Sequence, residues 1–340
     1  MSMYYRPFNN IPQLANIIGA IIGGLSCFII LLSCIRYKHL NTISGKLVFW
    51  QNSYIILESV GILFLSPNIY ETCVLQAFLI EFATIGSMLW ACMIVYVLLH
   101  ITQGRFSALG SYKPENDMPT FSAICFIGSL IVGMVPVASR SYGLVNGKYY
   151  CYIHDRTTTS RAVLSAHYGI MWSLITFILI ASVRVYYQLK NLNTTRPFIT
   201  SESKMIPSTT TVSLIGDADS VKLVRPAISS RSSNATIKAV YGRLIYYPLL
   251  LLIWEIPISV YRIWLAAEHT KPPLALFVVA VFLVRCHGMY NLLVFAMQPT
   301  TRREWRRDTH ALSSYVKNFF DCKSFHNTQK DELDCSQVDV

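Results

Sequence analysis

Seven long apolar runs, separated by polar segments, limit what this chain can fold into. Each run approaches the roughly 20 residues that a helix needs to cross a hydrocarbon core about 30 Å thick. The runs are continuous, not alternating, which favours helices over the strands of a barrel. The sequence therefore predicts an all-α membrane protein, a seven-transmembrane helix bundle. The expected spans are Leu14–Ile35, Leu47–Leu65, Val74–Ile101, Phe121–Ala138, Val163–Tyr187, Leu244–Ala267 and Leu274–Met297.

Composition and charge predict how the bundle is oriented across the membrane. Of the 340 residues, 53% are hydrophobic and only 14% are charged, and the net charge is +11. Basic residues collect in the loops after the first, third and fifth runs and in the C-terminal tail, as the positive-inside rule requires, with the outer loop Ser139–Arg161 as the exception. We expect a plasma-membrane protein with its N-terminus outside, its C-terminus in the cytosol and its basic inner surface near anionic lipids, and we expect no nucleic-acid partner.

The polar segments suggest three regions. Residues 1–13 form an extracellular tail, residues 14–298 form the transmembrane domain, and residues 299–340 form a cytosolic tail. Within the domain, residues 190–238 make a long third cytosolic loop that is rich in serine, threonine and basic residues. Such a segment buries too little apolar surface to become ordered. Its hydroxyls make it a candidate kinase substrate, and an unregulated linker is the alternative.

The tail begins with an expected amphipathic helix. Trp305, Leu312, Val316 and Phe319 recur at helical spacing, with charged residues between them. That pattern is typical of a helix lying on the inner leaflet. Cys322 follows directly and is a candidate for palmitoylation, although an unmodified thiol is the simpler alternative.

The nine cysteines divide by compartment. Five fall inside the apolar runs, and two lie in the tail, where a reducing cytosol is expected. Cys73 and Cys151 are the two that remain on the oxidising side. We expect them to form a disulfide that holds the outer loop over the bundle, the alternative being two free thiols.

Ionisable residues within the runs are the candidate functional groups, because an unpaired charge at membrane depth costs at least about 2.5–3.5 kcal/mol. Arg285 lies at the same depth as Glu58 and Glu255, which predicts that the cation faces one or both acids. Nearer the outside, Glu81 is level with Arg262. The functional interpretation is that Glu81, Arg262 and neighbouring Gln76 line a ligand cavity while the deeper set forms a switch. Purely structural ion pairs are the alternative.

The sixth run contains a candidate hinge. Pro257 removes a backbone hydrogen bond and bends a helix, and Trp254 precedes it by about one turn. A static bend is the alternative. In the seventh run, His287 is a lone histidine, which is more often packed or hydrogen-bonded than a ligand.

Other classes of seven-helix protein lack support in the sequence. A retinal protein needs a lysine in the seventh span, and Leu274–Met297 has none. A carrier built from repeats should show internal similarity, which is not apparent. No metalloprotease motif or paired-carboxylate site is present, so we expect no enzyme activity, no cofactor and no metal site. A transporter or channel remains the alternative function.

The chain resembles a G-protein-coupled receptor in its span count, its cysteine pair, its basic inner loops and its amphipathic tail helix. The rhodopsin-like triplet Asp/Glu-Arg-Tyr is replaced by Leu98-Leu-His, and Asn-Pro-x-x-Tyr by Tyr290-Asn-Leu-Leu-Val. The chain is more similar to the cyclic-AMP-receptor-like family of slime moulds and fungi. The residues that carry this resemblance are Cys73-Val-Leu-Gln-Ala-Phe-Leu-Ile, Leu89-Trp90, Tyr247-Pro248, Trp254-x-x-Pro257, Arg262 and Gly288-x-x-Asn291.

The chain departs from that family at two core positions. His287 stands where the family usually has glutamine, and Glu255 follows Trp254 where the family often has leucine. The resemblance implies a receptor that senses a small extracellular ligand, activates a heterotrimeric G protein and is desensitised by kinases. Because the basic residues of the outer loop and Arg262 would attract negative charge, an anionic ligand is one of the alternatives.

Overall fold

The structure of the chain is a computed structural model. It describes residues 10–37, 40, 42–64, 69–102, 116–144, 151–153, 157–194, 244–267, 273–298, 301–310 and 314. The chain divides into two compact units, Met1–Leu292 and Leu293–Val340. The second unit contains a helix over residues 301–310, where the amphipathic helix is expected. Leu312, Val316, Phe319 and Cys322 lie outside the described residues, so the apolar face of that helix and its palmitoylation stay predictions.

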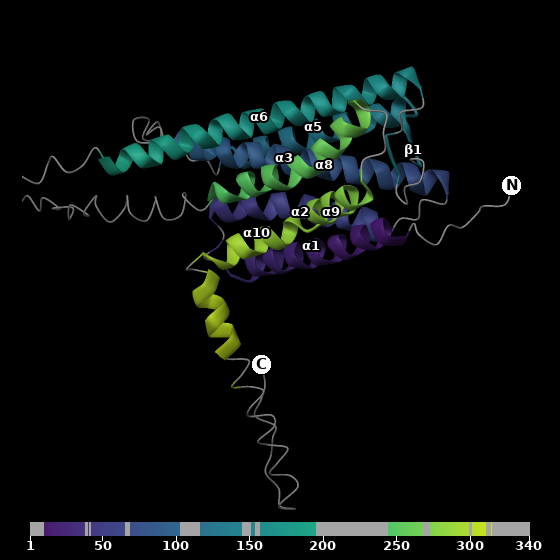
Figure 1. Cartoon of the computed structure of the whole chain (residues 1–340). Helices are drawn as coiled ribbons and strands as arrows, with labels where there is room; N and C mark the ends of the chain where they lie inside the picture. Colours follow the sequence, from purple (N-terminus) through teal and green to yellow (C-terminus); the bar gives the residue numbers. More distant parts are fainter. Residues whose placement is uncertain are drawn as a thin grey trace, which may run out of the picture. The chain divides into compact units, whose positions relative to one another are not determined.

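Each predicted apolar run is helical in the structure. The helices of the first unit run side by side (Figure 1). They are α1 Asn10–Arg36, α2 Ile43–Phe64, α3 Tyr70–Thr102, α5 Met118–Ala138, α6 Thr158–Thr194, α8 Tyr246–Ala267, α9 Leu274–Arg285 and the first part of α10 His287–Ala296, whose last four residues belong to the second unit.

The described helices make this a multi-pass membrane protein. Four of them (α1, α3, α5 and α6) are long and apolar enough to cross a membrane, and the bent pair of α9 and α10 meets the same criteria when it is taken as one span. Large apolar side chains face outward, including Leu25, Phe126 and Ile131, which are 60%, 52% and 59% exposed. Exposed apolar surface of this extent suits contact with lipid. The α2 helix and the shorter apolar stretch of α8 do not meet the same length and composition criteria, so seven crossings stay a prediction.

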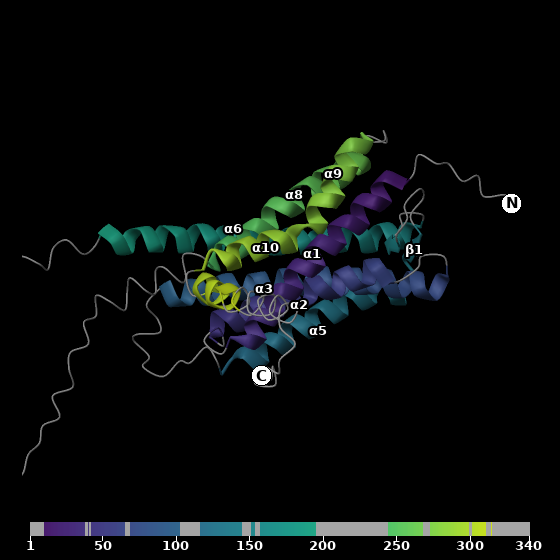
Figure 2. The ribbon, with the colours of Figure 1, turned by 90° about the horizontal axis from the view of Figure 1, so that it is seen from below.

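Helix α3 lies at the centre of the first unit. It packs against α2, α5, α6 and α8 and against both strands of a short hairpin. The view in Figure 2 shows α3 lying between neighbouring helices. Its buried residues lie on all sides of the helix and include Glu81, Trp90 and Leu98. The buried polar residues of α3, which include Gln76 and Glu81, are therefore enclosed by protein and not by lipid.

The all-α prediction misses a small hairpin next to the start of α3. Strands β1 (Tyr142–Leu144) and β2 (Cys151–Ile153) pair antiparallel, with Tyr142 opposite Ile153. Three-residue strands give no hydrophobic alternation that could be detected in a sequence. Cys151 of β2 forms the expected disulfide with Cys73 of α3, with 5.3 Å between the two Cα atoms. The disulfide prediction is confirmed.

The seventh run is broken, not continuous. Helices α9 and α10 meet at Cys286 and are bent by 42°. The Cys286 N–H donates to the carbonyls of Phe282 and Leu283 at 3.0 and 3.1 Å, so the last turn of α9 tightens before α10 begins. An apolar pattern alone continues through such a turn, which is why the sequence predicts one helix.

Two helix ends in the structure differ from those predicted from the sequence. Helix α1 begins at Asn10, within the expected N-tail, because Pro12 falls in its first turn, where a missing N–H is tolerated. Helix α6 continues to Thr194, so residues 190–194 are helical and not part of a disordered loop. The remainder of that predicted loop lies outside the described residues, as do residues 1–9.

Candidate ligand cavity

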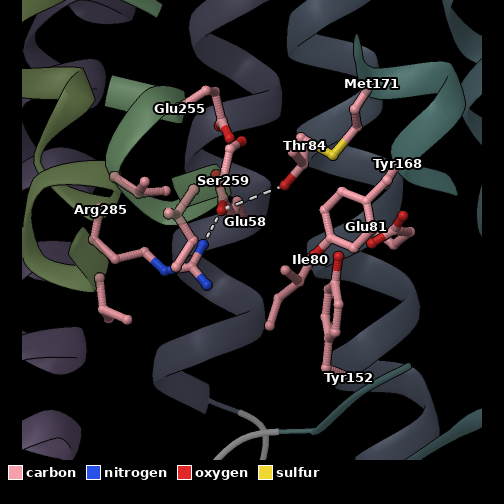
Figure 3. A pocket seen from close by; sticks show the side chains of 13 residues that line it. Glu58, Ile80, Glu81, Thr84, Tyr152, Tyr168, Met171, Glu255, Ser259 and Arg285 are labelled. Atoms are coloured by element: carbon pink, nitrogen blue, oxygen red, sulfur yellow. Dashed lines mark hydrogen bonds and ion pairs between the residues drawn. The ribbon is translucent and has the colours of Figure 1, made fainter. Parts of the chain in front are cut away.

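A polar cavity of about 50 Å³ lies inside the first unit, and residues of α2, α3, α6, α8, α9 and β2 line it. Four of its lining side chains are ionisable: Glu58, Glu81, Glu255 and Arg285. Figure 3 shows these groups directed toward a common space. Side chains from five helices and an outer strand thus meet around one cavity.

On the α2 and α9 side of the cavity, Arg285 forms an ion pair with Glu58. The Nε atom of Arg285 also donates to Asn16 Oδ1 of α1 at 3.0 Å, and Thr84 Oγ1 donates to Glu58 at 3.5 Å. Figure 3 marks the Glu58 contacts with dashed lines. Both partners are largely buried, at 11% and 7% side-chain exposure. The pair and its two hydrogen-bond partners therefore connect four helices, α1, α2, α3 and α9.

A second ion pair lies nearer the hairpin. His167 Nδ1 of α6 contacts the Glu81 carboxylate, and His167 Nε2 lies 3.2 Å from the Tyr152 hydroxyl of β2. A neutral imidazole with its proton on Nδ1 donates to Glu81 and accepts from the tyrosine, whereas a protonated ring donates to both. This chain of contacts connects α3 and α6 to the hairpin. It differs from the predicted Glu81–Arg262 pair, and the Arg262 side chain lies outside the described residues.

Glu255 differs from the other two acids. Its side chain is buried, with the residue 8% exposed, and it lines the cavity from α8. It forms no hydrogen bond or ion pair with any residue that the structure describes. Figure 3 shows its carboxylate pointing toward that of Glu58. The cavity therefore holds one buried carboxylate that lacks a counter-charge of its own.

Gln76 lies beneath the hairpin and not in the cavity lining. Its Nε2 donates to the Gly61 carbonyl at 3.3 Å, and its Oε1 accepts from the Cys151 backbone N–H at 3.1 Å. These two bonds hold β2 on α3 and α2, next to the disulfide. The geometry gives Gln76 a role in positioning the hairpin.

The candidate hinge packs against the bent seventh segment. The Trp254 ring of α8 stacks on Tyr290 of α10, with centroids 4.0 Å apart and planes 20° apart. Pro257 lies inside α8 one turn later. A movement of α8 about the proline therefore requires this stack to slide or separate.

A polar network stabilises the region beyond the bend. Asn291 Nδ2 donates to Asn52 Oδ1 at 3.2 Å, and Cys27 Sγ donates to the same oxygen at 3.2 Å. Asn52 in turn donates to the Val48 carbonyl at 2.7 Å. His287 contacts the Val284 carbonyl through Nδ1 at 2.6 Å, and it does not line the cavity. Asn291 thus has a structural partner in α2 and His287 has one in α9.

Five side chains in these contacts were not identified from the sequence: Asn16, Asn52, Thr84, Tyr152 and His167. Of these, His167 carries a detectable signal, because it is the one histidine of the fifth run. Within the described part of the chain, no group of three or more His, Cys, Asp or Glu side chains could hold a metal ion.

Comparisons with known proteins show which known fold this chain resembles. No family model matches the chain, and no curated protein matches it by sequence. Among solved structures, the crystal structure of squid rhodopsin aligns with a TM-score of 0.65 and 13% identity, covering 96% of this chain and 93% of that one. Identity this low shows the fold alone. The chain therefore has a helical fold like that of squid rhodopsin.

Proposed function

We propose that this chain is a seven-helix receptor that binds a small extracellular ligand in the described cavity and activates a heterotrimeric G protein. One observation carries the proposal. Tyr152, from an outer hairpin tethered by Cys73–Cys151, lines a polar cavity in the core of a rhodopsin-like fold. A ligand entering from outside would contact the hairpin and five helices at once, so its binding energy could act on their relative positions.

The deep charges supply a candidate switch. Arg285 pairs with Glu58 of α2, while Glu255 of α8 presents a second carboxylate to the same cavity. A ligand that changes the pairing of Arg285 would change the attraction between α8 and α9. The ligand must bind the two arrangements unequally to shift their populations. Movement of α8 about Pro257 would displace its cytosolic end and open a crevice for a Gα helix.

Several finer features of the proposal rest on sequence patterns. These are seven membrane crossings, an extracellular N-terminus, a plasma-membrane location and membership of the cyclic-AMP-receptor-like family. Kinase action on the third cytosolic loop and palmitoylation of Cys322 belong to the same set. Each concerns residues outside the described ranges or a property that a fold does not fix.

Nucleotide exchange on a purified Gα subunit tests the receptor function. The full chain, reconstituted in lipid nanodiscs, should accelerate the exchange when a ligand from a panel of small extracellular compounds is added. A Glu255→Gln variant should alter the basal or the maximal rate, whereas Glu71→Gln, at an exposed position of α3, should leave both unchanged. Substrate or ion flux through protein-containing vesicles, without any effect on Gα, would instead favour a transporter or channel.

A further inference from the structure

The cavity has more acidic than basic groups. Three carboxylates and one guanidinium line it, a formal balance of −2 if all four are ionised. Arg285 neutralises Glu58, and His167 lies against Glu81 from behind the lining. Glu255 is the carboxylate of the cavity lining that has no ion-pair partner among the described residues. It is more than nine-tenths buried, it points into the cavity, and it forms no hydrogen bond or ion pair with a described residue, since the nearby guanidinium of Arg285 is paired with Glu58.

A buried carboxylate without a partner is costly, and a bound cation removes that cost. The groups around Glu255 suit an ammonium group. The hydroxyls of Ser259 and Thr84 supply acceptor oxygens, and the rings of Tyr152 and Tyr168 supply aromatic faces that attract cations. Carboxylate, hydroxyl and aromatic face together recognise a protonated amine better than they recognise an anion.

An anion would lack a free positive partner among the described cavity groups. Arg285 is already held by Glu58 and Asn16. Arg140 and Arg161 are exposed and do not line the cavity. Their charge acts at the outer surface, where it cannot offset three buried carboxylates at short range.

The size of the cavity limits the occupant. A volume of about 50 Å³ corresponds to about three to five water molecules, at roughly 10–15 Å³ each. An ammonium head group with a few attached carbons fits this space. A larger amine would place only its charged end there, with the remainder toward the hairpin.

We propose that this cavity is a site for the protonated amino group of a small cationic ligand, with Glu255 as its counter-charge. The inference rests on the proposed function, because it takes the cavity to be the receptor's ligand site. Tyr152 and Tyr168 flank the amine, and the Glu58–Arg285 pair borders it. A ligand at this position alters the electrostatic environment of the deep switch directly.

Direct binding to the full chain in nanodiscs tests the site without any G protein. Methylammonium and ethylammonium chloride are titrated while the thermal unfolding midpoint is measured, with sodium chloride at equal ionic strength as reference and sodium acetate and cyclic AMP as anionic probes. The two amines should raise the midpoint, and the reference and the anions should not. Glu255→Gln should weaken amine binding by about tenfold or more, since one partner of a buried charge pair is lost. Glu71→Gln should bind as the native chain does.

Glu255→Asp keeps the charge and provides a second variant if Glu255→Gln fails to fold; it should retain amine binding. Equal stabilisation by sodium ions, stabilisation by the anions alone, or undiminished amine binding in Glu255→Gln would each overturn the proposal. The last result would mean that the amine binds without Glu255 as its counter-charge. Amine binding without Gα exchange would contradict the receptor function but support the amine site. Gα exchange driven by a ligand whose effect is the same in Glu255→Gln would support the receptor function but contradict the amine site.

Discussion

Arg285 of α9 forms an ion pair with Glu58 of α2 at membrane depth, and the same guanidinium donates to Asn16 of α1. These contacts satisfy a cation in a place where an unpaired charge costs at least about 2.5–3.5 kcal/mol. They also position a charged group on the border of the cavity. The stability of the bundle and the chemistry of the site therefore depend on one residue.

Removing either partner of the Glu58–Arg285 pair should destabilise the protein more than removing both. Glu58→Met or Arg285→Met leaves a buried charge unpaired, at a cost of about 3–5 kcal/mol, whereas the double variant replaces the pair with apolar side chains. Thermal unfolding in detergent, followed by tryptophan fluorescence, measures the difference. The exposed pair Glu304–Arg307 is a control that should contribute less than about 1 kcal/mol. Additive losses in the double variant would argue against a coupled pair.

The Trp254–Tyr290 stack should influence signalling. Tyr290→Leu removes a ring contact worth about 0.5–1.5 kcal/mol, which corresponds to a two- to tenfold change in an equilibrium between two arrangements. We expect basal Gα exchange to change by about that factor, and we expect Tyr290→Phe, which keeps the ring, to behave as the native chain does. Equal basal rates in the leucine and phenylalanine variants, at equal surface expression, would count against a hinge coupled to this stack.

Loss of the disulfide should release the hairpin. Cys73→Ser, Cys151→Ser and the double variant should each lose about 2–4 kcal/mol of stability, and to the same extent, because each breaks the same bond. Ligand binding should fall as well, since Tyr152 follows Cys151 and lines the cavity. Cys34→Ser, at a free cysteine, is the control for mutating a thiol. A double variant much weaker than either single variant would show a second role for one cysteine.

Two glycines permit the close approach of α1 to the bend between α9 and α10. A Cβ atom on Gly23 would overlap the Arg285 carbonyl, and one on Gly288 would overlap the Gly23 carbonyl. Gly23→Ala and Gly288→Ala should each destabilise by about 1–3 kcal/mol. Gly169→Ala is the matched control, because nothing lies within 4 Å of its Cβ position. Unfolding midpoints of the three variants give the comparison, and equal midpoints would contradict the observed packing.

Alkaline pH should loosen the hairpin through Tyr142. Burial, with smaller effects of Glu81 and Tyr152, raises the pKa of the Tyr142 phenol above its ordinary value. Because the folded-state pKa is the higher one, the stabilisation is fully present below about pH 10 and is lost as the pH rises above it. The phenol also donates to the Gly133 carbonyl at 3.0 Å. Midpoints from about pH 8 to about pH 11 should fall more steeply for the native chain than for Tyr142→Phe. Parallel profiles would exclude this residue as the cause.

Features that depend on short stretches of sequence could be predicted well. The helical runs follow from continuous apolar composition, and the Cys73–Cys151 bond follows from which cysteines face the oxidising side. The contact between Arg285 and Glu58 could be predicted because the position of a residue along a helix sets its depth in the membrane, and these two residues were expected at the same depth. The all-α fold class is correct apart from one small hairpin.

Features that depend on how a helix is turned about its own axis could not be predicted. The contact of Glu81 with His167 of α6, and of His167 with Tyr152 of β2, was not predicted, and the predicted Glu81–Arg262 pair stays a prediction because the Arg262 side chain lies outside the described residues. Gln76, expected in the cavity, instead holds the hairpin. The rotation of each helix is set by packing against several neighbours at once, and a single sequence carries no record of those pairings.

The sequence by itself determined that the chain forms membrane helices, with polar groups buried among them and one disulfide at the outer end. Local composition is enough for this, because lipid accepts only apolar residues and helical backbone. The tertiary structure decided which polar groups meet: Arg285 with Glu58, Glu81 with His167, and Glu255 with no described partner. That outcome depends on long-range packing, which brings three carboxyl groups and one guanidinium to the lining of a single cavity.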